Sequence, residues 1–315
     1  MARAIDILTM GEPLMEFSEQ ERDGVRVYLP GHGGDTSNCA VAAARQGAKA
    51  ACFTAVGDDA FGRSFLALWD AEGVDHSRVL VRPDARTGIY FISYGPDGHA
   101  FSYYRARSAA SLVTAAEVPA DLVASARVLH VSGISQAISL SACDAVFHAI
   151  RLAKQAGVLV SYDTNLRLAL WPLDRARAVI HAAVALADIV RPGLDDARQL
   201  TGRETPDAIC DHYLGFGVKV VALTLGAEGT LVATPDRREQ VPGRKVEAVD
   251  ATGAGDTFGG AFLAEYLRTG DPFRAAAYGN AAAALSTQGH GAVAPMPRRP
   301  QVEAFMAVPP SPNKG

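Results

Sequence analysis

The sequence of 315 residues lacks features that mark several common classes of protein. Lysine and arginine number 30 against 34 aspartate and glutamate residues, so the net charge is −4 and the basic excess of a general nucleic-acid binder is missing. No apolar run reaches the roughly 18 residues that a membrane-spanning helix needs. Asp6 interrupts the short apolar run near the N-terminus, which argues against a signal peptide. We therefore expect a cytoplasmic protein that binds neither nucleic acid nor a membrane.

Cysteine is scarce, and three common catalytic or nucleotide-binding motifs are absent. The four cysteines, Cys39, Cys52, Cys143 and Cys210, show neither a CxxC pair nor metal-ligand spacing, so we expect buried, reduced thiols. The sequence contains no Gly-x-x-x-x-Gly-Lys-Ser/Thr, and its first expected strand is not followed by Gly-x-Gly-x-x-Gly. It also lacks Gly-x-Ser-x-Gly. These absences argue against a P-loop nucleotidase, a Rossmann dehydrogenase and an α/β-hydrolase.

What is present is a regular alternation of strands and helices, with 49% apolar residues to build a core. This alternation predicts one α/β domain with a parallel sheet covered on both faces, and with ligands at the carboxyl ends of strands. Residues 309–315 have nothing to bury, so we expect a flexible tail. Strands are expected at residues 5–10, 51–56, 128–131, 158–163, 189–190, 218–225, 230–233 and 245–249. Helices are expected at residues 39–46, 63–72, 140–156, 173–186, 195–201, 206–214, 261–267, 272–286 and 301–306.

Two expected hairpins interrupt this rhythm, at about residues 14–30 and 86–107. The first turns at Asp23-Gly24 and the second at Gly95-Pro96-Asp97-Gly98. We expect them to pair into a small sheet that stands off the main domain as a lid. A homodimer formed through the aromatic residues of this lid is left open. Four lid residues are candidates to face the ligand, with plain packing as the alternative for each tyrosine: Tyr90, Tyr103, Tyr104 and Arg105.

The stretch from Asp250 to Gly260 carries the strongest chemical signal in the sequence. Gly253, Ala254 and Gly255 lie where a loop becomes a helix, and the first amides of a helix lack intrahelical partners and attract negative charge. Glycines also leave these amides accessible, so we expect an anion cradle. Asp256 would then lie inside a site built for anions, where it could accept the proton of a hydroxyl. The alternative is a structural turn that Asp256 caps.

Two further polar stretches also follow expected strands. The first contains Gly33 and Gly34, with Asp35 and Asn38 as hydrogen-bonding groups for hydroxyls; its alternative is a loop with a helix cap. The second ends in Arg167, whose planar fork of donors suits a carboxylate or a phosphate. A surface ion pair is the alternative for that arginine.

Two signatures, in the right order, resemble one enzyme family. The run Asp-x-Thr-Gly-Ala-Gly-Asp-x-Phe-Gly-Gly begins at Asp250, and Gly-Gly-x-x-x-Asn-x-Ala begins at Gly33. Both resemble the ribokinase-like (phosphofructokinase-B type) carbohydrate kinases. The resemblance implies a three-layer α/β/α fold with a mostly parallel central sheet and a small β-sheet lid. It also implies transfer of the γ-phosphoryl group of ATP to a sugar hydroxyl, with Asp256 as catalytic base, residues 253–255 as anion hole and the segment from Gly33 to Asn38 on the sugar.

The same resemblance implies ATP and Mg²⁺ as cofactors. The family's Asn-x-x-Glu near the metal is replaced here by Gly193-Leu194-Asp195-Asp196, so the Asn is lost and Asp196 remains as the candidate for the metal. Asp250, with the carbonyl of Thr252, resembles a loop that binds a monovalent cation, which leaves K⁺ open. The implied nucleotide-binding residues are Asn165, Arg167, Thr224, Gly226, Gly229, Gly253, Gly255 and Asn280, and Ala284 and Ser286 could line the adenine.

Within this family, two stretches resemble the 2-keto-3-deoxygluconate kinases. They are Tyr103-Tyr104-Arg105 and Asp163-x-Asn165-x-Arg167-x-x-Leu170-Trp171. In those enzymes the lid Tyr-Arg pair and the strand-end Arg hold an acidic sugar, and two arginines suit a carboxylate better than a neutral ribose. A fructokinase or another neutral-sugar kinase of the family stays open. A non-catalytic sugar-binding protein is a remote alternative, against which the intact Asp256 argues.

Overall fold

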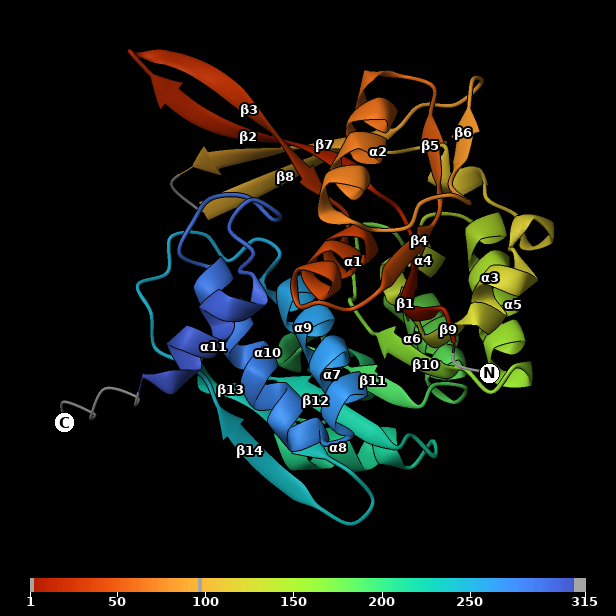
Figure 1. The fold of residues 1–315 in the computed structure, drawn as a ribbon, viewed down its shortest axis with the longest axis vertical. Coiled ribbons are helices and arrows are strands. Elements are labelled where there is room, and N and C mark those ends of the chain that lie inside the picture. Colours follow the sequence, from red (N-terminus) through yellow and green to blue (C-terminus); the bar gives the residue numbers. More distant parts are fainter. Residues whose placement is uncertain (1–2, 96–97, 309–315) are drawn as a thin grey trace.

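A computed structural model describes residues 3–95 and 98–308 of the chain (Figure 1). Its centre is a sheet with the strand order β14-β13-β12-β11-β10-β9-β1-β4, parallel from β4 to β12 and antiparallel at β13 and β14. The expected tail at 309–315, and residues 96 and 97 of the second hairpin turn, lie outside the described residues. The strands are β1 (Ile5–Met10), β4 (Ala50–Phe53), β9 (Ala126–Ser132), β10 (Leu159–Asp163), β11 (Ile189–Arg191), β12 (Val220–Thr224), β13 (Gly229–Ala233) and β14 (Arg238–Pro242).

Helices cover both faces of this sheet, and the strands are apolar on both faces as a result. In β1, the side chain of Ile7 packs into one core cluster and that of Leu8 into the other, as the two-residue period of a strand requires. One face is covered by α1 (Asp35–Arg45), α2 (Ala60–Glu72), α9 (Ala254–Thr269) and α10 (Pro272–Ser286). The other is covered by α3 (Ala120–Ser125), α4 (Gly133–Ala137), α5 (Leu140–Gln155), α6 (Leu173–Val184), α7 (Leu194–Thr201) and α8 (Pro206–Leu214).

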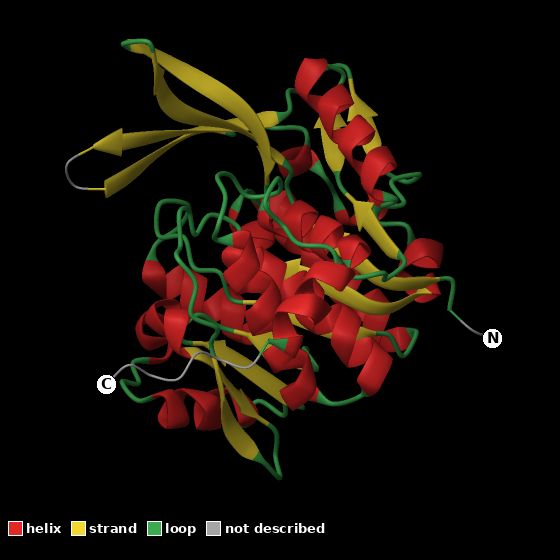
Figure 2. Cartoon of the chain, turned by 60° about the vertical axis from the view of Figure 1, so that its left-hand side comes forward, coloured by secondary structure: helices red, strands yellow, loops and turns green. Residues whose placement is uncertain are grey.

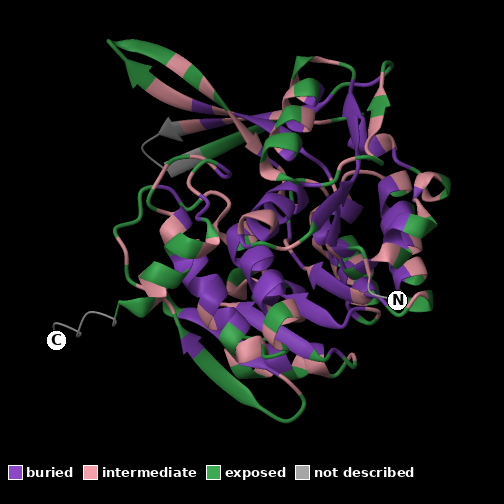
Figure 3. Ribbon diagram, viewed as in Figure 1, coloured by how far each residue is buried: buried purple, intermediate pink, exposed green. Residues whose placement is uncertain are grey.

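The expected three-layer α/β/α fold with a mainly parallel sheet is confirmed, and Figure 2 shows its layers. In Figure 3 the strands of the central sheet are mostly buried, except for the edge strand β14, which is mostly exposed. The four cysteines are unpaired and buried, as expected. Within residues 3–95 and 98–308, no helix combines the length and apolar character needed to cross a bilayer.

A second sheet of four strands projects from the body in Figures 1 and 2. Its order is β3-β2-β7-β8, and β2 pairs in parallel with β7, so the two hairpins join as the sequence predicts. The rings of Phe17 and Phe91 stack across this pairing, with centroids 5.2 Å apart. The outer ends of β2 and β3 are exposed (Figure 3). The strands are β2 (Leu14–Arg22), β3 (Val25–Gly33), β7 (Gly88–Gly95) and β8 (Gly98–Tyr104).

Two strand expectations were wrong because strand pairing depends on a partner that local sequence does not reveal. Residues 245–249 alternate like a strand, but they form none; their end is held by Thr287, whose carbonyl accepts from the amides of Val249 and Asp250. The sheet edge is instead the charged segment Arg238–Pro242, which pairs with β13. The strand expected at 51–56 breaks at Thr54, where β4 ends and β5 (Ala55–Gly57) turns to pair with β6 (Leu80–Arg82).

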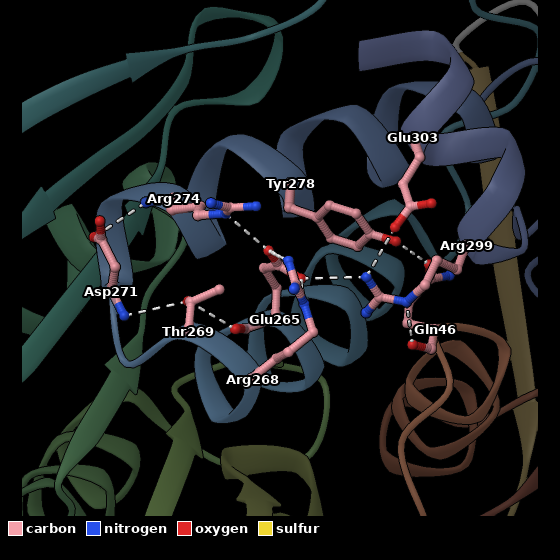
Figure 4. Close-up of polar contacts among 9 residues, drawn as sticks. All are labelled: Gln46, Glu265, Arg268, Thr269, Asp271, Arg274, Tyr278, Arg299 and Glu303. Atoms are coloured by element: carbon pink, nitrogen blue, oxygen red, sulfur yellow. Dashed lines mark hydrogen bonds and ion pairs between the residues drawn. The ribbon is translucent and has the colours of Figure 1, made fainter. Parts of the chain in front are cut away.

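The last helix, α11 (Arg299–Ala307), is fastened to the body by a buried carboxylate (Figure 4). Glu265 on α9 has 2% of its side chain exposed and accepts hydrogen bonds from Arg268, Arg274 and Arg299. Burial alone would raise the pKa of Glu265, but these arginines outweigh it and lower the pKa. Arg299 also donates to the carbonyl of Gln46 over 2.7 Å. One carboxylate therefore ties α9, α10, α11 and the end of α1 together.

Candidate active site

A cavity of about 750 Å³ lies between the four-stranded sheet and the carboxyl edge of the central sheet. Strands β1, β10, β11 and β12 end at this edge, as expected for a ligand site in a parallel sheet. The predicted residues that line it are Gly34, Asp35, Asn38, Tyr90, Tyr103, Arg105, Asn165, Arg167, Asp196, Thr224, Asp250, Gly253, Gly255 and Asp256. Those outside its lining are Gly33, Tyr104, Gly226, Gly229, Ala254 and Asn280.

The N-terminus of α9 forms one wall of the cavity. Gly253, the residue before the helix, has φ 73°, a left-handed conformation that glycine adopts without strain. A side chain added at Gly255 would meet no atom within 4 Å, so the space above this turn is open. The amide of Ala254 already donates to the carbonyl of Ala251. Of the three predicted cradle residues, Gly253 and Gly255 therefore face the cavity, while Ala254 holds the loop.

Asp256 follows this turn, and its carboxylate faces groups from distant parts of the chain. Its Oδ2 accepts a hydrogen bond of 2.8 Å from the side-chain amide of Asn38, on α1. Burial raises the pKa of Asp256 to about 8; the charge of Asp35 adds to this rise and the hydrogen bond from Asn38 opposes it. Asp35 in turn accepts from the side chain of Asn165. The stretches at residues 250–260, 33–38 and 163–167 thus meet around the Asp256 carboxylate.

Two charged residues at this edge were not among the site residues predicted from the sequence. Arg191, the last residue of β11, is 3% exposed, and its guanidinium pairs with Asp163 at the end of β10 over 2.9 Å. Burial raises the pKa of Asp163 to about 6, although the charge of Arg191 opposes that rise. A charged residue directly after a short apolar strand was the available signal, because strand ends of parallel sheets form ligand sites.

A third residue that the sequence analysis missed, Glu12, compensates the charge of Arg105. Glu12 follows β1, its side chain is fully buried, and it forms an ion pair with the guanidinium of Arg105. Ser108 donates a further hydrogen bond to the same carboxylate. Arg105 and Arg167 both line the cavity, but the charge of Arg105 is already compensated by Glu12. The Nε of Arg105 is buried and has no hydrogen-bond partner among the described residues.

Arg167 differs from Arg105 because it is exposed. Its Nη1 donates to the carbonyl of Leu166, and no ion pair joins it to a carboxylate within residues 3–95 and 98–308. The nearby Asp196 accepts a hydrogen bond of 2.9 Å from the amide of Leu166. Burial raises the pKa of Asp196, and the charge of Arg167 opposes that rise. The cavity wall thus carries one arginine without an acidic partner, next to one half-buried carboxylate.

The tyrosines of the four-stranded sheet alternate between its two faces. Tyr90 lines the cavity and donates to Glu16, and Gly33 makes room for it, because an added Cβ there would lie 2.5 Å from the tyrosine oxygen. Tyr103 also lines the cavity, with the guanidinium of Arg105 5.6 Å from its ring centre. Tyr104 points to the other face, where it is 66% exposed.

The residues predicted for the nucleotide are only partly at the cavity. Thr224 lines it. Gly229 has φ 100°, and an added Cβ would lie 2.2 Å from the carbonyl of Val241, so it serves a tight turn. Asn280 donates to the carbonyls of Val241 and Pro242 and accepts from Thr230. That asparagine therefore fastens α10 to β13 and β14.

The loop before α9 is organised by Asp250. Its two carboxylate oxygens accept hydrogen bonds from the amide and hydroxyl of Thr252 and from the amide of Gly291. Burial would raise the pKa of Asp250, but these hydrogen bonds outweigh it and lower the pKa. The carboxylate thus holds the loop in the shape that presents Gly253 and Gly255 to the cavity.

A parallel α/β sheet, an open helix N-terminus and a buried carboxylate beside it define a phosphate-handling enzyme of the carbohydrate-kinase class. The comparisons agree: the model of the pfkB family of carbohydrate kinases matches residues 10–299. The chain is 36% identical to a 2-dehydro-3-deoxygluconokinase of Bacillus subtilis, over 96% of both chains. It is 34% identical to a fructokinase of Oryza sativa, over 95% of this chain and 97% of that one.

Solved structures give the same result. The chain resembles a putative ribokinase II of E. coli, solved with ATP and Mg²⁺, with a TM-score of 0.89 and 28% identity over 96% of this chain and 99% of that chain. The protein belongs to the pfkB family of carbohydrate kinases and is an ATP-dependent sugar kinase. Kinases of this family use ATP together with a divalent metal ion.

Proposed function

We propose that this kinase phosphorylates 2-keto-3-deoxygluconate, also called 2-dehydro-3-deoxygluconate, to 2-keto-3-deoxy-6-phosphogluconate. The observation that carries the proposal is Arg167, an exposed guanidinium on the cavity wall with no carboxylate partner among the described residues. Such a group gains most from a substrate that brings its own carboxylate, because a charge-assisted bidentate pair is stronger than a bond to a neutral hydroxyl. The 36% identity to a kinase of that name supports the same substrate.

In the proposed reaction the sugar hydroxyl lies beside Asp256. The hydroxyl oxygen forms a bond to the γ-phosphorus of ATP, its proton passes to the Asp256 carboxylate, and the bond from γ-phosphorus to the bridging oxygen breaks to release ADP. The amides of Gly253 and Gly255 stabilise the charge of the transferring group. Asn38 holds the carboxylate in place through its hydrogen bond, so the base is oriented before the substrate arrives.

The residues on the nucleotide side fit a divalent cation that is held mostly by phosphate oxygens and water. Among the described residues, no three His, Cys, Asp or Glu side chains form a metal-binding group, and Mg²⁺ commonly keeps several waters beside one or two carboxylates. Asp196 is the carboxylate we assign to it. When bound, the cation offsets the negative charge of the phosphates. We also assign a monovalent cation, K⁺, to the loop of Asp250 and Thr252.

The four-stranded sheet acts as a lid in this proposal. Leu14, Tyr90, Phe101 and Tyr103 from that sheet line the same cavity as Asp256. A sugar bound between them is therefore covered from one side by the sheet and held from the other by the central domain. Closure over the sugar would exclude the water that otherwise competes as phosphoryl acceptor.

A second candidate, a fructokinase, is favoured by the ion pair between Glu12 and Arg105. Because that pair compensates the charge of Arg105, only Arg167 remains to attract a carboxylate. Fructokinases are also among the similar proteins, at 34% identity.

ADP release with a panel of sugars decides between the two candidates. We expect kcat/KM for 2-keto-3-deoxygluconate to exceed that for fructose or ribose by about 10² or more, because only the acidic sugar brings a carboxylate that can form a charge-assisted bidentate pair with Arg167. Equal or faster turnover of fructose would contradict the acid-sugar proposal and leave the kinase standing.

Arg167→Ala should shrink that preference mainly by weakening the acidic sugar. ATP KM must be measured in the same variant, since Arg167 could also contact nucleotide phosphates. Arg63→Ala is a matched control, because Arg63 is an exposed arginine in a surface ion pair with Asp58, outside the cavity lining; it should leave the preference unchanged.

A further inference from the structure

Arg191 lines the cavity and has a buried guanidinium. Its side chain is 2% exposed and forms an ion pair with Asp163 over 2.9 Å. A second nitrogen, Nη1, lies 3.3 Å from the carbonyl of Gly255, inside the first turn of α9. Nη2 also lies 3.4 Å from the ring of His130, whose pKa is held low by burial and by the charge of Arg191, so that ring is neutral. The guanidinium is thus held by contacts on several sides.

The sequence makes space for this guanidinium. A Cβ added at Gly259 would lie 2.1 Å from Nη1 of Arg191 and 2.3 Å from its Cζ. Gly259 lies three residues after Asp256, about one turn along the same helix. The arginine therefore packs directly against the backbone of the turn that presents the proposed base.

The charges around Asp256 are predominantly negative. Its pKa is raised by burial first and then by neighbouring carboxylates, and the positive charge that opposes the rise is Arg191. The titratable and charged groups facing Asp256 come from four elements packed around it: Asp35 and Cys39 on α1, Tyr90 on β7, Asp163 on β10 and Arg191 on β11. Without Arg191, only the hydrogen bond from Asn38 would be left, among the causes named here, to oppose the effect of burial and of two carboxylates on Asp256.

We propose that Arg191 is a positioning residue for phosphoryl transfer: its guanidinium, fixed between Asp163 and the first turns of α9, favours the ionised form of the Asp256 carboxylate and holds the turn that presents it to the hydroxyl. This inference rests on the proposed role of Asp256 as the base. Arg191 acts through Asp256 and through the Gly255 turn. It therefore affects the chemical step rather than the recognition of the sugar.

The test is the pH dependence of the single-turnover rate, which reports the chemical step separately from product release. Arg191→Met removes the charge and keeps much of the side-chain length. At about pH 7 its rate should fall about tenfold or more, as expected for loss of a nearby opposite charge. The acid limb of the profile should move to higher pH, so that activity partly recovers in alkaline buffer. Arg191→Lys should recover much of the rate at neutral pH.

Two further variants should move the acid limb of the pH profile in opposite directions. Gly259→Ala keeps the arginine but displaces its guanidinium, so the acid limb should again move to higher pH. Asp163→Asn removes a negative charge near Asp256 and frees the arginine, so the limb should move to lower pH. Gly279→Ala is the matched control: an added Cβ there would lie 2.8 Å from the ring of Phe258, so it should lower stability without moving the limb.

A uniform loss of rate at all pH values, with an unmoved acid limb, would overturn the role of Arg191. Limb shifts in the same direction for Asp163→Asn and Gly259→Ala would overturn it as well. If Arg191→Met fails to fold, the directions in which Gly259→Ala and Asp163→Asn move the acid limb decide whether Arg191 has this role. Failure of the underlying function is distinguishable, because Asp256→Asn would then keep its activity, whatever the Arg191 variants do.

Discussion

Asp256 combines two demands that conflict at the scale of a single residue. A base must be ionised to accept a proton, yet burial and the charge of Asp35 both favour its protonated form. The hydrogen bond from Asn38 and the charge of Arg191 act in the other direction. A carboxylate with a raised pKa accepts a proton more readily once it is ionised, which suits general-base catalysis near neutral pH.

Replacing this carboxylate with an amide should remove the base and little else. We expect Asp256→Asn to lower kcat by at least about 10²-fold, the scale of general-base catalysis, with ATP and sugar affinities nearly unchanged. Isothermal titration with both ligands and steady-state kinetics under saturating substrates provide the two readouts. Retention of more than about half of the parent activity would show that Asp256 is not the base.

The same substitution should stabilise the fold in a pH-dependent way. The unfolded Asp256 ionises near its ordinary pKa, whereas the folded group keeps its proton to higher pH, so stability is lost as pH rises between these two values. Asn has no proton to lose. Melting temperatures of variant and parent should therefore agree at about pH 4, and the variant should melt higher by about 2 °C or more at about pH 8. An equal difference at both pH values would argue against a raised pKa.

At the scale of elements, the Glu265 cluster decides how α11 is held (Figure 4). The carboxylate is buried, while Arg268 and Arg274 are at least half exposed, so most of the desolvation cost falls on the single acid. Removing that acid leaves three guanidinium groups facing one another. Truncation of one partner in a buried network is more damaging than loss of a surface pair.

Glu265→Gln should therefore lower the free energy of unfolding by about 1–3 kcal/mol at about pH 7. The folded pKa of Glu265 is lowered, so its contribution is present above the unfolded pKa and is lost as pH falls through the folded one. Urea unfolding of variant and parent should consequently converge in acid. The kinetics should not change, because Glu265 lies at the far end of α9 from the cavity.

Glu303→Gln provides the matched control for this prediction. Glu303 pairs with the same Arg299 over 3.3 Å, but its side chain is 58% exposed. Exposed pairs contribute little, about 0–1 kcal/mol. If Glu303→Gln destabilises the fold as much as Glu265→Gln, burial of the Glu265 carboxylate is not what makes the cluster matter.

At the scale of the whole molecule, the cavity is lined by two separate sheets. The central sheet supplies its floor, and the four-stranded sheet supplies Tyr90, Phe101 and Tyr103. The ion pair of Glu12 with Arg105 and the hydrogen bond from Ser108 to Glu12 link the segment after β8 to the end of β1. The relative position of the two sheets therefore sets the shape of the sugar site.

Sugar binding should slow hydrogen exchange in residues 89–94 and 101–105, because a ligand between the sheets restrains both. Strands β13 and β14, at the opposite edge of the central sheet, are the internal reference and should exchange at the same rate with and without sugar. Unchanged exchange in both segments at saturating sugar would mean that the four-stranded sheet is a rigid structural element and no lid.

The sequence by itself determined the architecture, and it predicted the anion site at the N-terminus of α9. Short, nearly continuous apolar runs that alternate with helical segments define a covered parallel sheet, since strands that are apolar on both faces need helices on both faces. The Gly253-Ala254-Gly255-Asp256 run predicts an anion site because glycine conformation and helix polarity act over a few residues. These are local effects, and local sequence carries them.

Only the tertiary structure decided which charges compensate one another. Arg105 was predicted to bind the substrate, but it forms an ion pair with Glu12, which lies 93 residues earlier. Arg191 directly follows the expected strand at 189–190, but its partners Asp163 and Gly255 lie 28 and 64 residues away. Residues 245–249 alternate like a strand but found no partner, while Arg238–Pro242 did. Ion pairs and strand edges depend on distances across the fold, because electrostatic interaction and ladder hydrogen bonds require proximity in space that spacing in the chain does not specify.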